Sequence, residues 1–112
     1  METTRQQRVA RLLQKELADM LQTDGRAFSA SGLITVTSAE VSKDFSLARI
    51  YLSIFGVKEK QAVLDGLNAH KKELRFKLGQ RIKNQLRIVP EIYFVLDETL
   101  DYIENIDNLL KQ

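Results

Sequence analysis

The residue types that most often perform chemistry in proteins are scarce in this chain. His70 is the only histidine and there is no cysteine, so neither a histidine cluster for a metal ion nor a thiolate nucleophile is available. Asp97 and Glu98 are adjacent carboxylates, but neighbours in an extended segment point to opposite faces and do not form an acid–base pair. Asp97 fits better as the solvated end of a strand or as the cap of a following helix. We therefore expect no catalytic residue, no metal site, no cofactor and no small-molecule substrate.

Basic residues are the stronger chemical signal. Between His70 and Arg87 the chain has seven lysines and arginines against a single acid, Glu73. Ordinary solvated surfaces mix both signs, so this excess favours binding to phosphate groups, which lysine and arginine contact by replacing counterions. Phe76 is the aromatic residue best placed to stack on a base, because it projects away from the apolar stripe of a helical projection. That stripe consists of Leu74, Leu78, Ile82 and Leu86.

The distribution of charge along the chain supports an anionic partner. Residues 1–90 have 16 basic and 9 acidic side chains, a balance of +7, whereas residues 91–112 have 1 and 6, a balance of −5. A basic body of this kind attracts nucleic acid, although composition does not distinguish RNA from DNA. The candidate contacts lie in the cluster described above, in the first predicted helix and in the first predicted turn. They are Arg8, Arg11, Lys15, Lys43, Lys71, Lys72, Arg75, Lys77, Arg81, Lys83 and Arg87.

The elements that position these residues follow from the spacing of apolar side chains. Residues 5–21 repeat apolar side chains every three or four positions, which predicts an amphipathic helix with Arg8, Arg11 and Lys15 on its polar side. Residues 22–32 are rich in glycine, serine and alanine and predict a loop. Residues 33–37 and 48–55 have the β-branched and alternating patterns of strands, and a turn at 41–45 predicts that they pair antiparallel.

The second half of the chain is expected to contain three helices and one strand. Residues 58–86 have helical spacing, but Lys71 would interrupt the apolar face of one continuous helix. We therefore expect two helices with a kink near residues 68–72; the alternative is one long helix in which the Lys71 ammonium reaches out to water. Pro90 ends this region, alternation over 92–96 predicts a third strand, and spacing over 100–110 predicts a short terminal helix.

The length of 112 residues fits a single domain, with a core over about 5–97 and an acidic helix over about 98–112. No apolar run approaches the roughly 18 residues that cross a bilayer. The first seven residues are polar and unlike a secretory signal, so we expect a cytoplasmic protein without membrane contact.

Several stretches, taken together and in order, resemble the ribosome-binding factor A family. The resemblance covers about residues 5–110, and its most distinctive part is the predicted turn with its flanking strands. The matching stretches are Arg5-Gln6-Gln7-Arg8-Val9-Ala10 with Lys15-Glu16-Leu17, Thr35-Val36-Thr37 with Val41-Ser42-Lys43-Asp44-Phe45-Ser46-Leu47-Ala48, Lys77-Leu78-Gly79-Gln80-Arg81, and Arg87-Ile88-Val89-Pro90-Glu91-Ile92-Tyr93-Phe94 with Asp97.

The resemblance implies an α+β fold of the KH-like (type II) class. In that fold a three-stranded sheet has helices on one side, in the order helix-strand-strand-helix-kink-helix-strand, here followed by a short C-terminal helix. The family's kink is commonly built on Ala-x-Gly, whereas this chain has Ala69 and His70 at the junction and no glycine.

The resemblance also implies a function without catalysis. It implies a monomer that binds the free small (30S) ribosomal subunit and its 16S rRNA and assists late assembly and rRNA processing. Two other readings of the residues remain open at this point. One is a permanent protein of the small ribosomal subunit, and the other is a protein-interaction module whose acidic terminal helix docks a basic partner.

Overall fold

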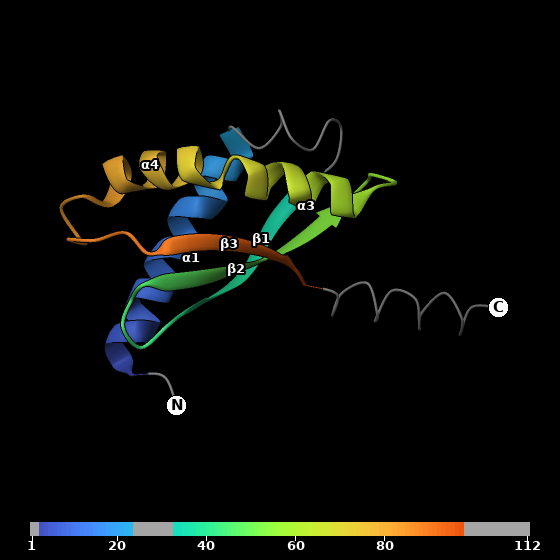
Figure 1. Cartoon of the computed structure of the whole chain (residues 1–112). Helices are drawn as coiled ribbons and strands as arrows, with labels where there is room; N and C mark the ends of the chain where they lie inside the picture. The colour runs from blue at the N-terminus through green and yellow to red at the C-terminus, as the bar shows by residue number, and fades with distance from the viewer. Residues whose placement is uncertain (1–2, 24–32, 98–112) are drawn as a thin grey trace.

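The computed structural model describes residues 3–23 and 33–97, which form a three-stranded sheet and the helices that cover it (Figure 1). The predicted order of elements is confirmed over these residues, whereas the predicted C-terminal helix lies outside them. In chain order the elements are α1 (Thr4–Thr23), β1 (Leu33–Val41), β2 (Leu47–Phe55), α3 (Lys60–Ala69), α4 (Lys71–Ile82) and β3 (Glu91–Leu96).

The sheet has the strand order β1-β2-β3 and mixes two kinds of pairing. β1 and β2 pair antiparallel, as predicted, and β2 and β3 pair parallel. β1 continues to Val41 rather than ending at Thr37, so the turn begins at Ser42, one residue later than expected. The additional length includes a bulge, because the register shifts between Val36 and Ser38.

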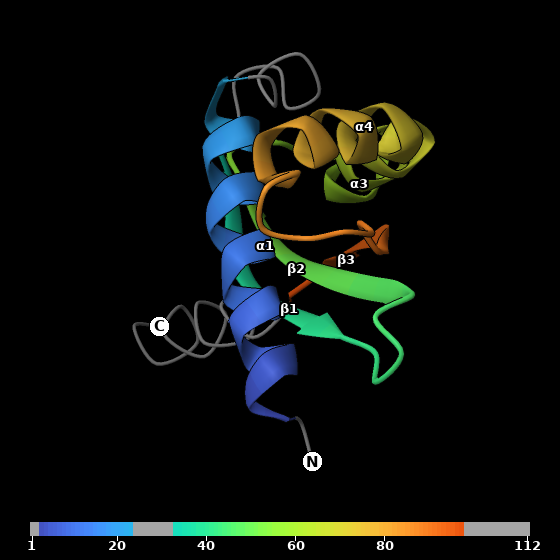
Figure 2. The same ribbon diagram turned by 90° about the vertical axis from the view of Figure 1, so that its left-hand side faces the viewer.

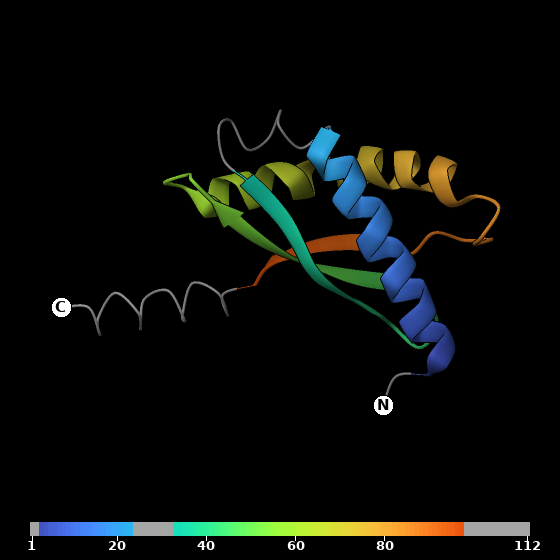
Figure 3. The same ribbon diagram turned by 180° about the vertical axis from the view of Figure 1, so that it is seen from behind.

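One face of the sheet is apolar and covered, which explains why the described helices lie on it. Alternate residues of β2 and β3 point to the same side and are buried, among them Ile50, Leu52, Ile92 and Phe94. Figure 3 shows α1 running obliquely across the strands. Figure 2 shows α3 and α4 beside α1 on the same side. Buried side chains of these three helices complete a single core.

The first helix begins with a capping box. The hydroxyl of Thr3 accepts a hydrogen bond from the backbone N–H of Gln6 (3.1 Å), and the side-chain carbonyl of Gln6 accepts one from the N–H of Thr3 (2.9 Å). The amide of Gln6 also donates to the backbone carbonyl of Val41 (2.9 Å), which ties the start of α1 to the end of β1. At its other end α1 reaches Thr23, so the predicted loop is wrong for residues 22 and 23.

The predicted kink is present. α3 ends at Ala69 and α4 begins at Lys71, with His70 between them at φ −105° and ψ 15°. The backbone N–H of His70 donates to carbonyls of α3, and its carbonyl accepts from Leu74 of α4 (3.0 Å). The two helices therefore share one residue as the end of the first and the cap of the second, and the alternative of one continuous helix is wrong.

The helices of the described segments are amphipathic and charged on one side. None of them combines the length and the apolar character that a membrane-spanning helix requires.

Candidate nucleic-acid interface

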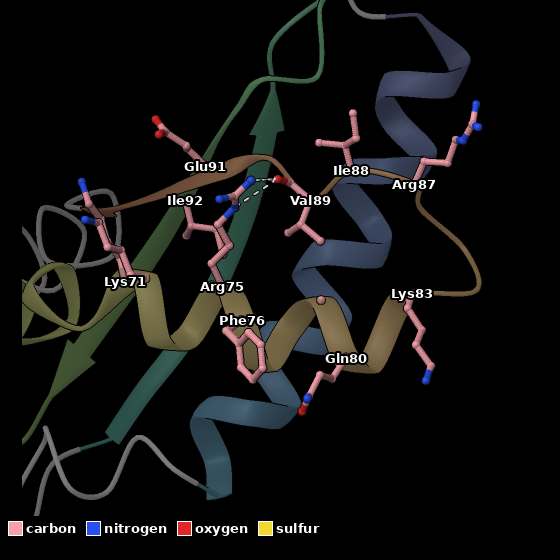
Figure 4. Close-up of a pocket in the computed structure, with 12 residues that line it drawn as sticks. Lys71, Arg75, Phe76, Gln80, Lys83, Arg87, Ile88, Val89, Glu91 and Ile92 are labelled. Atoms are coloured by element: carbon pink, nitrogen blue, oxygen red, sulfur yellow. Dashed lines mark hydrogen bonds between the residues drawn. The ribbon is translucent and has the colours of Figure 1, made fainter.

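A groove of about 770 Å³ runs between α4 and the segment that leads into β3. We call it the α4 groove, with α4 as one wall and residues 87–92 as the other. Figure 4 shows Lys71 at one end of it and Lys83 and Arg87 at the other. It brings together residues of the second predicted helix and residues of the segment around Pro90 that leads into the third predicted strand.

The charge of the α4 groove is strongly positive. Its lining includes five basic side chains and one acid, Glu91. The basic residues are Lys71, Lys72, Arg75, Lys83 and Arg87, all of which were candidates from the sequence. A concave surface with this excess of one sign concentrates anionic groups, and phosphate oxygens are the natural partners of lysine and arginine.

The positions of Lys83 and Arg87 differ from the sequence-based expectation. The apolar stripe was predicted to continue as helix to Leu86, but α4 ends at Ile82 and a turn follows at residues 83–85. Lys83 and Arg87 therefore reach the groove from the connecting segment and not from successive turns of one helix. Neither of these side chains makes a hydrogen bond or ion pair with another residue of the described segments.

Two large apolar side chains stand exposed at the same groove. Phe76 is 67% exposed and Ile88 is 74% exposed, and they come from opposite walls. The prediction that Phe76 projects away from the core is confirmed. Gly79 of α4 and Val89 of the opposite wall lie close together, because a Cβ added at Gly79 would be in van der Waals contact with Cγ2 of Val89 (3.4 Å). The arrangement offers apolar surface for bases or riboses together with charge for phosphates.

Arg75 makes hydrogen bonds that the sequence did not predict. Its Nε donates to the backbone carbonyls of Val89 (3.1 Å) and Pro90 (3.2 Å), and its Nη2 also donates to that of Val89 (2.5 Å). Figure 4 shows the guanidinium spanning from α4 to the opposite wall. Arg75 thus joins the two walls of the groove.

Lys71 lies against an aromatic ring at the edge of the sheet. Its ammonium nitrogen is 3.8 Å from the centroid of the Tyr93 ring, a cation–π contact. A second hollow of about 520 Å³ lies on the far side of residues 88–91, between Tyr93 and Phe45 of the β1–β2 turn. The two hollows share Arg75, Ile88, Val89 and Glu91, so they adjoin along this segment, but the second has only one basic residue, Arg75, against one acid, Glu91.

The remaining candidates on α4 do not line the groove. The guanidinium of Arg81 is paired with Glu16 (2.8 Å) and with Asp19, both on α1. The hydrogen bond to Glu16, followed by the one to Asp19, raises the pKa of Arg81 above its ordinary value. Arg81 therefore holds α4 to α1, and its charge is compensated by two carboxylates. Lys77 is exposed but is not part of the groove lining.

The other candidates are exposed elsewhere. Arg8, Arg11 and Lys15 lie on the outer side of α1, opposite the buried residues, as their spacing predicted. Lys43 is exposed in the turn between β1 and β2. The structure does not bring these four residues to the α4 groove, and whether they contact nucleic acid stays a prediction.

The bonds that hold the kink were not visible in the sequence. The side chain of Asn68 donates to the backbone carbonyl of Phe94 (3.1 Å) and accepts from its N–H (3.0 Å). Phe94 presents these two groups at the edge of β3 that has no neighbouring strand among the described residues. Asn68 thus takes the place of a neighbouring strand and fixes the end of α3 against the sheet. Ala69 and His70, the predicted kink residues, follow immediately and are both exposed.

Within residues 3–23 and 33–97, no cluster of three or more histidine, aspartate or glutamate side chains has the arrangement of a metal site. Asp97, the other candidate for chemistry, accepts a hydrogen bond from the hydroxyl of Thr37 at the β1 bulge (2.8 Å). It lies at the end of β3, as expected, and its proposed role as a helix cap falls outside the described residues.

Comparison with known proteins decides the family. The sequence model of "Ribosome-binding factor A" matches residues 5–110. This chain belongs to the ribosome-binding factor A family. Ribosome-binding factor A of Cytophaga hutchinsonii is 44% identical over 112 residues, which cover 100% of this chain and 84% of the relative. That of Flavobacterium johnsoniae is 41% identical over 111 residues, with 98% and 85% covered.

Solved structures of the family have the same fold. The crystal structure of ribosome-binding factor A from Thermus thermophilus matches with a TM-score of 0.69 at 23% identity, covering 81% of this chain and 94% of that one. A homology model of Thermus thermophilus ribosome-binding factor A was fitted into the cryo-EM map of a complex of 30S with that factor. It matches with a TM-score of 0.59 at 28% identity, covering 77% and 88%. The α+β, KH-like class expected from the sequence is confirmed, and family membership identifies a binding protein and not an enzyme.

Proposed function

We propose that this protein binds the free small ribosomal subunit through its 16S rRNA and assists late assembly and rRNA processing without catalysing a reaction. The observation that carries the proposal is the α4 groove, with five basic residues and one acid in a member of a ribosome-binding family. The Thermus thermophilus relative in complex with 30S supports the choice of partner. The proposed location is the cytoplasm, where that partner is assembled.

The physical basis of the proposed activity is adhesion to phosphates. Lysine and arginine side chains of the two groove walls replace counterions along the rRNA backbone, so affinity depends steeply on salt and little on sequence. Such binding changes the course of assembly only if the protein prefers one rRNA conformation to another. The groove supports such a preference, because its walls come from separate segments joined by Arg75, which gives the positive charges a defined spacing.

Sedimentation of a cell lysate tests the proposal against the two alternatives. An assembly factor is expected to co-sediment with free small subunits and to be absent from complete ribosomes. A permanent ribosomal protein would follow both, and a protein-interaction module would follow neither. Repeating the gradient at increasing potassium chloride should release the protein progressively, and retention independent of salt would contradict the phosphate mechanism.

A further inference from the structure

The groove depends on a wall with little regular structure. Between the end of α4 and the start of β3, residues 83–90 are turn and irregular chain. The backbone N–H groups of Gln85 and Leu86 bond to the last turn of α4, through the carbonyl of Ile82 (2.8 and 3.0 Å). The N–H of Glu91 bonds to Ser46 of the turn between β1 and β2 (2.9 Å). Residues 87–90 lie between these anchors and carry the exposed Ile88.

Arg75 supplies the polar contacts that hold this stretch to α4. Three hydrogen bonds from its Nε and Nη2 end on the carbonyls of Val89 and Pro90. Pro90 is buried. Without Arg75 its carbonyl oxygen would have no hydrogen-bond donor, and a buried acceptor without a donor destabilises the folded protein. The fork of a guanidinium can reach two successive carbonyls at once, which a single ammonium group cannot do in the same way.

We propose that Arg75 is a positioning residue for RNA binding: it fixes the wall formed by residues 87–90 at its distance from α4 and does not itself neutralise a phosphate. The inference rests on the proposed function of the α4 groove. It separates Arg75 from three of the other four basic residues of the groove. Lys72, Lys83 and Arg87 face the ligand, and Arg75 keeps the surface that carries Arg87 and Ile88 in place.

Two substitutions at the same position separate the two roles. Arg75→Lys keeps the positive charge and removes the fork, whereas Arg75→Gln removes both. A phosphate contact needs the charge, so Arg75→Lys would then bind nearly as well as the wild type. A positioning residue needs the two-pronged guanidinium, so both variants should lose subunit affinity to a similar extent. We expect a loss of about tenfold, which corresponds to roughly 1.4 kcal/mol of lost hydrogen bonding.

The measurement is the binding constant for purified small ribosomal subunits at several concentrations of potassium chloride. We expect both variants to bind more weakly by a similar factor, with the slope of log affinity against log salt unchanged. We also expect trypsin to cut the folded Arg75→Lys protein after Arg87 faster than it cuts the wild type, because the wall is released. Thermal melting shows whether each variant is folded at the temperature of the assay.

Several results would overturn the inference. Binding by Arg75→Lys that equals the wild type, or lies nearer to it than to Arg75→Gln, would make the charge decisive. A slope for Arg75→Gln that is shallower by about 0.7–0.9 would mean that a phosphate contact was lost. Wild-type affinity in both variants would mean that subunit binding does not depend on how residues 87–90 are held.

The combined variant Lys72→Gln, Lys83→Gln and Arg87→Gln, measured in the same series, keeps the inference separate from the proposed function. If this variant binds like the wild type, the groove is not the site and the proposed function fails. If it binds weakly while Arg75→Lys is unaffected, only the role of Arg75 fails.

Discussion

Asp97, one of the two adjacent carboxylates considered in the sequence analysis, has a structural partner. Its carboxylate accepts a hydrogen bond from the hydroxyl of Thr37 (2.8 Å), the residue at which β1 bulges. The backbone carbonyl of Thr37 in turn accepts from the side chain of Gln14 on α1 (3.3 Å). The bulge is thus held from both sides, by the end of β3 and by α1. Asp97 belongs to the fold that carries the groove and not to a reaction.

A double-mutant cycle between Thr37 and Asp97 tests this role. Thr37→Val, Asp97→Ala and the double variant should each unfold at lower urea concentration than the wild type, because a hydrogen bond to a charged group is lost. The coupling free energy between the two positions is expected to be about 1 kcal/mol or more. Strictly additive effects would show that the two side chains do not interact in solution.

The turn between β1 and β2 depends on the ionised form of Asp44. Its carboxylate accepts hydrogen bonds from the hydroxyls of Ser46 (2.7 Å) and Ser42 (2.8 Å) and from the N–H of Ser46 (3.1 Å). These bonds, first those of the two hydroxyls, lower the pKa of Asp44 from 3.8 to about 2. The turn also contains Phe45 at φ 60°, a left-handed conformation that costs a side chain with a Cβ energy.

The sign of the pH effect follows from the lowered pKa. A carboxyl with a lower pKa in the folded state stabilises that state above its unfolded pKa, and the contribution is lost as the pH falls from about 4 to about 2. We expect the amide resonance of Ser46 to shift with a midpoint near pH 2. A midpoint near the ordinary value of 3.8 would mean that the hydroxyl bonds do not form, and Asp44→Asn should abolish the transition.

At the scale of elements, the edge of β3 decides how the helix pair is placed. Among the described residues β3 has a sheet neighbour on one side only, and an unpaired strand edge invites association with other chains. Asn68 bonds to both backbone groups of Phe94 on the free side, and Arg75 bonds to the carbonyls just before β3. The two side chains hold α3 and α4 along this edge, one at the kink and one at the groove.

Replacing Asn68 with alanine is expected to destabilise the fold by about 2 kcal/mol, because both backbone groups of Phe94 lose their partner. Urea unfolding measures the change. Asn84→Ala is the matched control, since Asn84 is exposed in the turn after α4 and should change stability by less than about 0.5 kcal/mol. Equal stability of the two variants would contradict the role given to Asn68.

The sequence-based expectation of a monomer can be checked on the same samples by sedimentation equilibrium.

Local spacing predicted the elements because it depends on the chain within a few residues. The position of Lys71 in an apolar face was enough to indicate a kink, and alternation was enough to indicate β3. The bonds that place the elements join residues far apart in sequence: Asn68 with Phe94 over 26 positions, and Arg81 with Glu16 over 65. Periodicity contains no information about such pairs. The roles of Asn68, Arg75 and Arg81 therefore became visible only in the structure.

At the scale of the whole molecule, position divides the basic residues into groups with different roles. Lys72, Lys83 and Arg87 line a concave surface, whereas Arg8, Arg11 and Lys15 lie on the outer side of α1. Arg81 is compensated by the carboxylates of α1. Net charge alone does not separate these groups. The account predicts that subunit binding depends on where positive charge is removed, and not only on how much.

The measurement that tests this claim most directly is the salt dependence of small-subunit binding for two variants with equal charge. One replaces Lys72, Lys83 and Arg87 with glutamine, and the other replaces Arg8, Arg11 and Lys15 with glutamine. All six side chains are exposed, so both proteins should melt close to the wild type. We predict that the groove variant binds at least about tenfold more weakly, with a slope shallower by about 2, while the α1 variant loses clearly less affinity. Equal loss in both variants, or wild-type binding by the groove variant, would contradict the account.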